Sequence, residues 1–362
     1  MARIEQARTT ADPALYATAE KALRRSLSLQ PTGNSTAESG MAALAAARHD
    51  FTDARTWARK AITSDPYNPA AYGVLADAHT QLGQYRDAER AVQKMNDLRP
   101  DASSLARASY VFELRGSTVR ATELMRRSLT AATTDSEQAF AHACLSSLAL
   151  EDGDAPLALK EADQGLRKTP ADPALLDARA RAHAALGQTA QARADWQRAT
   201  DIAPLPHLLL ALGETHQALG HGEQAKAQFT LLRAQDTLRT SAGDPPDTDA
   251  ILFEADHGSP ARAVTMAEQA LRTRPFVAVH DAYAWALHKA GRHREALDQA
   301  DQALALGTRH ALWRYHRAAI HHALGNQAAA TADLQAALGP ASALNPLHAA
   351  HARALLKRIG TP

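Results

Sequence analysis

The sequence predicts an all-α protein in which about ten helix-turn-helix units stack along the chain. Three observations support this prediction. Glycines recur at a nearly regular spacing, alanines follow them at a fixed distance, and the composition favours helices over strands. Alanine, leucine, arginine and glutamine are abundant, whereas aromatic residues make up only 5% of the 362 residues and β-branched residues are few. We therefore expect helices throughout and no β-sheet.

The repeat is clearest in glycines that lie 33 to 38 residues apart. Eight of the 18 glycines follow this spacing: Gly83, Gly116, Gly153, Gly187, Gly220, Gly258, Gly291 and Gly325. Five residues after each glycine stands an alanine: Ala88, Ala121, Ala158, Ala192, Ala225, Ala263, Ala296 and Ala330. The alanine column continues upstream as Ala54 and Ala19, and six prolines follow at a fixed distance: Pro31, Pro66, Pro100, Pro170, Pro204 and Pro275. Self-similarity at such a period is typical of a repeat architecture.

Each column has a physical reason. Glycine ends a first helix because it adopts the left-handed conformation that follows many helices. The small alanine lets the second helix of the unit pack closely against the first, and the proline stops that second helix. Neither helix can bury its apolar stripe alone, so the units are expected to stack on one another.

This spacing of glycine, alanine and proline resembles the tetratricopeptide repeat, a helix pair of 34 residues. The second to tenth units approximate the motif from Ser35 to Ser342, and the best copies are Pro69–Ala102 and Pro173–Pro206. The motif is degenerate in the units that hold Ala121, Ala225, Ala296 and Ala330. The resemblance implies a right-handed α-α superhelix whose concave groove is lined by the first helix of each pair.

The predicted segments follow from where the period is interrupted. Residues 1–34 are a truncated first repeat whose first helix survives only at residues 2–8, residues 35–240 hold six repeats, residues 241–247 form a linker or hinge, residues 248–342 hold three repeats and residues 343–362 form a C-terminal capping helix. The segment 241–247 is rich in turn-forming residues, and a merely longer surface loop is the alternative to a hinge. The capping helix is expected over Pro346–Ile359, with a solvated face formed by His348, His351, Arg353, Lys357 and Arg358.

The sequence excludes several function classes. It contains no phosphate-binding loop, no HExxH metalloprotease motif and no GxSxG nucleophile motif, so we predict that the protein is not an enzyme and holds no cofactor. Its 40 Lys and Arg residues nearly balance 39 Asp and Glu residues, which disfavours nucleic acid as a partner. The single cysteine, Cys144, excludes an intrachain disulfide. No apolar stretch approaches the roughly 20 residues of a membrane span.

The resemblance also implies which side chains line the concave groove, because in such repeats these are the second, fifth, ninth and twelfth residues of each first helix. Transferred to this sequence, the rule gives Tyr110, Arg181, Glu214, Gln217, Asp281, Trp285, His288, Tyr315 and His322 as the candidate partner-binding residues. Asp281, Trp285 and His288 are spaced so that they share one helix face. Two other interpretations stay open: these side chains are solvated groove lining, or Trp285 packs in the core.

The favoured function is a scaffold that binds a protein or peptide segment in the concave groove. The alternative is a small-molecule or metal sensor at the C-terminal end of the groove, with a divalent metal between His288, His322 and a carboxylate. The oligomeric state and the partner stay undetermined. No metal site is among the predicted sites.

A closer resemblance is to actinobacterial tetratricopeptide proteins of unsettled role. Those proteins continue upstream into a complete repeat and often into an N-terminal signal or membrane anchor. We therefore expect this chain to be a trimmed or unusually short member of that group. The compartment is left open between a soluble protein and the extracytoplasmic part of a longer secreted or membrane-anchored protein.

Overall fold

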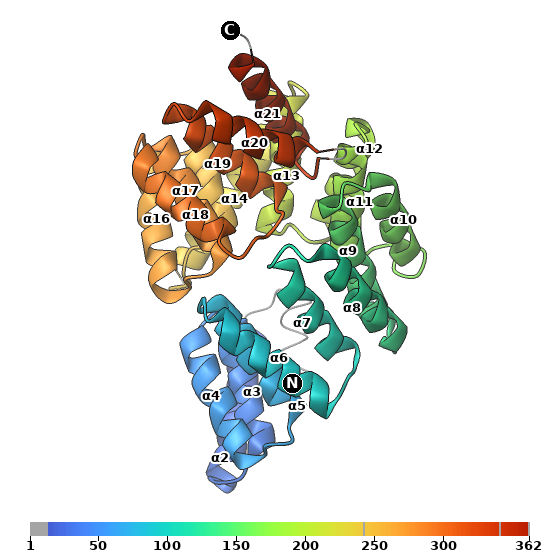
Figure 1. The fold of residues 1–362 in the computed structure, drawn as a ribbon. Coiled ribbons are helices and arrows are strands. Elements are labelled where there is room, and N and C mark those ends of the chain that lie inside the picture. Colours follow the sequence, from blue (N-terminus) through green and yellow to red (C-terminus); the bar gives the residue numbers. More distant parts are fainter. Residues whose placement is uncertain (1–13, 242, 340–341, 361–362) are drawn as a thin grey trace. The chain divides into compact units, whose positions relative to one another are not determined.

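The computed structural model describes residues 14–241, 243–339 and 342–360, and all regular secondary structure in these residues is helical (Figure 1). The first ten helices are α2 (Ala14–Leu29), α3 (Ser35–Ala47), α4 (Phe51–Ser64), α5 (Pro69–Gln81), α6 (Tyr85–Leu98), α7 (Ala102–Glu113), α8 (Thr118–Ala131), α9 (Asp135–Glu151), α10 (Ala155–Leu166) and α11 (Pro173–Ala185). The others are α12 (Thr189–Ile202), α13 (Pro206–Ala218), α14 (Gly222–Ser241), α15 (Thr248–His257), α16 (Pro260–Thr273), α17 (Val277–Lys289), α18 (His293–Leu304), α19 (Ala311–Ala323), α20 (Gln327–Leu338) and α21 (Pro346–Ile359).

Helices α3 to α20 follow one another as nine helix pairs, with α2 before them and α21 after them. Within pairs such as α3–α4, α11–α12 and α19–α20 the two helices pack against each other, and α4–α5, α10–α11 and α18–α19 join one pair to the next. The all-α fold and the packing of consecutive helices in pairs are therefore confirmed. The expected helix at residues 2–8 lies outside the described residues.

The turns inside the pairs explain the glycine column. Gly83, Gly187 and Gly291 have φ values of 68°, 73° and 80°, in the left-handed region that favours glycine. His49, which replaces glycine in the first turn of this kind, adopts the same conformation with a φ of 61°. Gly258 differs from the prediction because its φ is −135°. An added Cβ at Gly258 would overlap the side chain of Glu254, which accepts a hydrogen bond from the Ser259 backbone N–H at 3.0 Å.

The alanine column lies at the contact between the paired helices, as predicted. Ala54, Ala121, Ala192 and Ala330 each have no exposed surface. A larger side chain at these positions would push the paired helices apart, because protein interiors are packed too densely to absorb extra methylene groups. These alanines set the close spacing on which every pair depends.

The two interruptions of the period lengthen helices. The extra residues near residue 134 form the first turn of α9, where Thr134 and Glu137 make a capping box. The extra residues near residue 240 extend α14 to 20 residues, compared with 14 in α12. Asp247 then pairs with Arg239 and caps α15 by accepting the Ala250 N–H at 2.9 Å. The role of residues 241–247 as a hinge stays a prediction.

Contacts along the chain define two compact units. The first comprises residues 1–111 and 271–276, and the second comprises residues 112–270 and 277–362. The segment 241–247 therefore lies inside the second unit. In the first unit α2 packs on α3, and α3 and α5 also contact each other. Among the described residues, no helix has both the length and the apolar character that a membrane span requires.

Helix α21 has the predicted bounds but not the predicted surface. Its residues His351, Arg353, Lys357 and Arg358 are exposed, as expected of a cap. His348 is only 8% exposed, so its assignment to the solvated face is wrong. The reason is that α21 packs not only on α20 and α19 but also on α13, which lies far upstream in the sequence.

Candidate functional site

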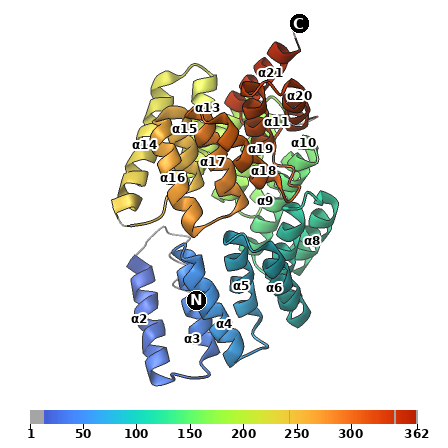
Figure 2. The ribbon, with the colours of Figure 1, turned by 60° about the vertical axis from the view of Figure 1, so that its left-hand side comes forward.

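Five inner helices of the second unit close into a ring. We call the first helix of each pair, and also α21, an inner helix. α13 packs on α15, α15 on α17, α17 on α19 and α19 on α21, and α21 packs back on α13. Figure 2 labels all five helices. In a solenoid, each repeat normally contacts only the repeats next to it. The contact between α21 and α13 therefore turns this stretch of concave groove into a protein interior.

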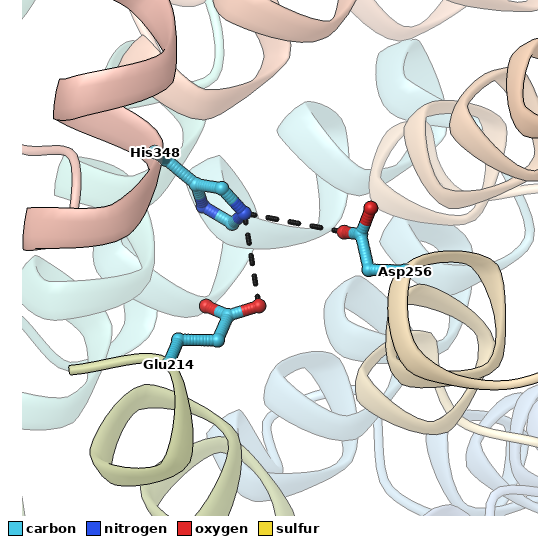
Figure 3. A group of neighbouring side chains, drawn as sticks. All are labelled: Glu214, Asp256 and His348. Carbon is cyan, nitrogen blue, oxygen red and sulfur yellow. Dashed lines mark ion pairs between the residues drawn. The ribbon is translucent and has the colours of Figure 1, made fainter. Parts of the chain in front are cut away.

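Three ionisable side chains from different helices of the ring point toward one another (Figure 3). Glu214 comes from α13, Asp256 from α15 and His348 from α21. His348 Nε2 lies 3.6 Å from Glu214 Oε1 and 3.9 Å from Asp256 Oδ2. Glu214 is further held by His257, whose Nε2 lies 3.2 Å from Oε1, and by Asn345, whose Nδ2 donates to Oε2. We call Glu214, Asp256 and His348 the carboxylate–histidine cluster.

Asp256 has its own set of partners. Trp285 Nε1 donates to Asp256 Oδ2 at 2.9 Å, and Lys289 Nζ lies 3.1 Å from Oδ1. Burial alone would raise the pKa of Asp256, but the electrostatic effects of the neighbouring His348 and Lys289 and the Trp285 hydrogen bond outweigh it. The pKa of this carboxyl therefore lies below its usual value, and Asp256 is an anion in the ring.

A second pair, Asp281 and His316, lies beside the cluster. His316 Nδ1 is 3.0 Å from both carboxylate oxygens of Asp281, and both side chains are at most 2% exposed. Trp285 stacks on the His316 ring with centroids 4.2 Å apart, which fixes the ring orientation. His316 Nε2 is buried without a hydrogen-bond partner. Asp281 thus holds the His316 ring through Nδ1, whereas Nε2 lacks a hydrogen-bond partner.

His316 faces a cavity of about 160 Å³ that the inner helices share. It is lined by Asp177, Arg181, Ala184, Trp196, His207, Leu210, Ala211, Glu214, Asp249, Leu252, Asp256, His310, Leu312, His316, Ala343, Leu344, Asn345 and His348. Burial, together with the charges of Arg181 and His316, lowers the pKa of His310 to about 3. Burial also lowers the pKa of His207. These two histidines are therefore neutral at physiological pH.

The lining also bears on what the cavity can do chemically. Among the described residues that line it there is no serine, threonine or cysteine. Asp281 holds the His316 ring in the way that a carboxylate holds a catalytic base. His316 nevertheless has no hydroxyl or thiol in this lining to activate as a nucleophile. The arrangement suits binding of a cation or of a cationic side chain, because carboxylates outnumber the single arginine.

The structure brings five of the predicted binding residues to this region. Arg181 and Glu214 line the cavity. Asp281, Trp285 and Tyr315 lie in the ring interior, where they are 2%, 4% and 6% exposed. They support the wall behind the cavity instead of lining an open groove. The low exposure of Trp285 agrees with the interpretation that this side chain packs in the core.

The other four predicted residues lie elsewhere. His288 stacks on Trp285, with ring centroids 5.1 Å apart. His322 Nδ1 lies 3.1 Å from the Gln327 side chain, and Gln217 is exposed on α13. Tyr110 belongs to the first unit and is 37% exposed. The one group of three potential metal ligands within the described residues includes neither His288 nor His322.

Two kinds of residue escaped the sequence analysis. Asp249 and Asp256 occupy the second and ninth positions of α15, so the positional rule used for the other repeats would have found them had it also been applied to this one. His316 and His348 stand outside those positions. They reach the site only because the ring closes, and no local pattern in the sequence reports that closure.

Comparison with known proteins agrees with this architecture. The successive helix pairs define a helical repeat protein. Residues 45–109 match the family model of the tetratricopeptide repeat. These residues therefore carry tetratricopeptide repeats, as the sequence predicted, and this fold supports a role in protein–protein interaction. A search of curated proteins finds no match.

Three solved structures are similar to this chain at low sequence identity. An IFIT1 monomeric mutant with Gppp-AAAA is 13% identical, with a TM-score of 0.50, over 83% of this chain and 71% of that one. PilW, a widely conserved type IV pilus biogenesis factor, is 20% identical, with a TM-score of 0.47, over 55% of this chain and 92% of PilW. Pseudomonas aeruginosa PilF is 15% identical, with a TM-score of 0.46, over 61% of this chain and 97% of PilF.

Proposed function

We propose that this protein is a non-catalytic scaffold that binds a protein or peptide segment at the concave face of its second unit. The observation that carries the proposal is that α11, α13, α15 and α19 all contribute inner-face residues to one cavity. Surfaces assembled from several stacked repeats are what such proteins use to bind extended partners. The cavity gives this surface a defined point at which a partner can anchor.

Charge favours a basic anchor. The cavity is lined by four carboxylates, Asp177, Glu214, Asp249 and Asp256. The cations beside them are fewer, namely Arg181 in the lining and Lys289, which pairs with Asp256. This excess of negative charge attracts a cation and repels a polyanion such as nucleic acid. Lysine and arginine reach such places readily because their long apolar stems carry the charge away from the backbone.

Size favours a single side chain. A volume of about 160 Å³ corresponds to roughly five water molecules at about 30 Å³ each. That is below the roughly 300 Å³ at which pockets for drug-sized ligands begin. We therefore propose that a lysine or arginine of the partner enters the cavity, while the rest of the segment lies across the inner helices.

The solvent side of the cavity lies near Asp177 and Arg181. The Arg181 side chain is 41% exposed, and its Nε is 3.8 Å from Asp177 Oδ2. A partner would meet these two residues first, with Gln217 as a further contact on the exposed part of α13. Direct contact with Asp281, Trp285 or Tyr315 would require the ring to open. Tyr110, His288 and His322 stay predictions for partner contact.

The experiment is a selection of twelve-residue peptides against the full chain, followed by affinity measurement with fluorescence polarisation. We expect the selected peptides to carry a lysine or arginine whose replacement by alanine removes binding. The double variant Asp177→Asn/Asp249→Asn should weaken binding about tenfold or more, which is about 1.4 kcal/mol. The control Asp298→Asn removes an exposed carboxylate of α18 and should leave affinity unchanged. Selection of acidic peptides, or equal binding by both variants, would refute the proposal.

A further inference from the structure

We propose that the carboxylate–histidine cluster binds a divalent transition-metal ion, for which zinc is the test ion. The cluster offers one atom from each of Glu214, Asp256 and His348, and these atoms all lie within 4.8 Å of one another. One imidazole and two carboxylates are a donor set that suits such ions. This inference goes beyond the proposed function, because peptide binding needs no metal.

The spacing of the ligands fits a metal better than a direct ion pair. His348 Nε2 is 3.6 Å and 3.9 Å from the two carboxylate oxygens, which is beyond hydrogen-bond length. The three groups therefore surround a common space instead of closing on one another (Figure 3). A tetrahedral site with metal–ligand bonds of about 2.0–2.1 Å places its ligand atoms about 3.3 Å apart. Small side-chain movements would bring the three groups to that geometry.

The residues around the cluster act as outer partners that orient metal ligands. Trp285 Nε1 donates to Asp256 Oδ2 at 2.9 Å, and Asn345 Nδ2 donates to Glu214 Oε2. Metal ligands in proteins are commonly held in this way by a second set of hydrogen bonds. Asn345 binds the Glu214 oxygen that is not counted toward His348, while Trp285 fixes the position of Asp256 Oδ2, the oxygen that faces His348.

An independent observation points to the same place. His316 lines the cavity beside the cluster, is only 1% exposed, and has an Nε2 without any hydrogen-bond partner. Its ring centroid is 6.4 Å from that of His348. A buried polar nitrogen is almost always satisfied. A water bound to the metal, or the metal itself after a rotation of the ligands, would satisfy His316 and complete the coordination.

The metal would join three inner helices that are far apart in the sequence. Glu214 lies on α13, Asp256 on α15 and His348 on α21. An ion held by all three would fasten α21 to α13 and keep the ring closed. Because the ligands converge from elements that separate on unfolding, metal binding would also stabilise the folded chain.

The test uses the full chain, freed of affinity tag and stripped with chelator, titrated with zinc by calorimetry and with cobalt by absorption spectroscopy. We expect one zinc per chain, a cobalt spectrum typical of nitrogen and oxygen ligands, and slower amide hydrogen exchange in α21 when zinc is added. Glu214→Gln, Asp256→Asn and His348→Gln should each weaken zinc binding about 100-fold, since even outer partners of metal sites contribute about 10- to 100-fold. Calcium and magnesium should not compete, because they prefer oxygen ligands.

The matched control is His351→Gln, which removes an exposed histidine from the same helix, α21. It should bind zinc as the unaltered chain does. Circular dichroism without metal checks that each cluster variant is folded, and at least one of the three conservative variants must be folded for the comparison. Absence of stoichiometric zinc binding by the unaltered chain, or equal binding by a folded cluster variant, overturns the proposal. Peptide affinity through Asp177 and Asp249 is measured separately, so failure of one proposal does not imply failure of the other.

Discussion

The α11–α12 and α19–α20 repeats share one ion-pair framework but differ at their inner faces. The two repeats are offset by 138 residues, the distance from Arg179 to Arg317. Arg179 donates to Asp195 at 2.6 and 2.7 Å and to Asp163 at 3.1 Å. Arg317 donates to Asp333 and Asp301, the residues at the same offset, at 2.8 to 3.1 Å. The same arginine clamp therefore joins successive repeats in both places.

The inner faces of the two repeats have different surroundings. At the positions of Asp177 and Ala178 in α11, α19 carries Tyr315 and His316. Trp196 donates to Asp177 at 2.8 Å and keeps it at the edge of the cavity, whereas His316 is buried against Asp281 and Trp285. The stacking contacts thus repeat along the chain, while the inner residues vary with what lies opposite them.

This difference indicates that the contact between α21 and α13, which closes the ring, determines which inner residues are enclosed in the site. In both repeats the helices and the clamp follow the same 138-residue offset, so local packing is alike. Of these two repeats, α19–α20 packs on α21, and α21 also packs on α13. Polar inner residues that would be solvated in an open groove are consequently enclosed in α19, where they must find partners.

The largest expected effect comes from the buried pair of α19. His316→Ala leaves the Asp281 carboxylate 2% exposed and without its partner, and breaking such a buried pair costs about 3–5 kcal/mol of unfolding free energy. Urea denaturation followed by circular dichroism, in the presence of chelator, measures the loss. At the same position of the α11–α12 repeat, Ala178 is already alanine, so that repeat does without the interaction.

The control for this prediction is the double variant His316→Ala/Asp281→Ala. If the two side chains stabilise the ring through each other, the double variant should lose clearly less stability than the sum of the single variants. Additive losses, or a loss below about 1 kcal/mol for His316→Ala, would show that the pair is not what holds α19 in the ring.

The second prediction concerns acid, and its expected effect is intermediate. Burial, with Arg181 and His316 nearby, lowers the pKa of His310 from 6.5 to about 3, so in the folded chain this histidine stays neutral in mild acid. The unfolded chain binds the proton near pH 6.5. Stability from this group is therefore present above pH 6.5 and is lost as the pH falls toward 3. Within that range each pH unit removes about 1.4 kcal/mol, so the loss between pH 6.5 and 4.5 is on the order of 2–3 kcal/mol.

The measurement is the pH dependence of unfolding free energy for the unaltered chain and for His310→Gln. Other groups titrate in the same range, so the quantity that counts is the difference between the two curves. His310→Gln should flatten the decline between pH 6.5 and 4.5. The corresponding position of the α11–α12 repeat holds Asp172, so the effect should be confined to the repeat inside the ring. Parallel curves would contradict this account of His310.

The sequence predicts most of the fold because its signals are local. The turn at His49 needs only one residue in the left-handed region, and the contact at Ala192 needs only a small side chain. Both requirements act within one helix pair, so they appear as columns in the sequence. Gly258 shows the limit, since its place in the column is right but its conformation is set by the Glu254 side chain.

The site was predicted less completely because it depends on contacts over long separations. Glu214 and Arg181 were found by their positions in the repeat, and both line the cavity. His348 was assigned to solvent because the period indicates where α21 begins but not that it returns to α13. The contact between α21 and α13 depends on the summed curvature of the intervening repeats, which no single residue encodes.

The smallest predicted effect tests whether the two repeats also differ at their helix starts. Asp172 caps α11 by accepting the Leu175 N–H at 3.0 Å, whereas the side chain of His310, at the start of α19, makes no capping hydrogen bond. Asp172→Ala should therefore cost about 1 kcal/mol, and Asp172→Asn should lose much less, because asparagine caps as well as aspartate. Hydrogen exchange of the first turn of α11 should speed up in Asp172→Ala, while the first turn of α19 stays unchanged. Unchanged exchange at α11 would mean that packing, not the cap, fixes where this helix begins, as the structure already indicates for α19.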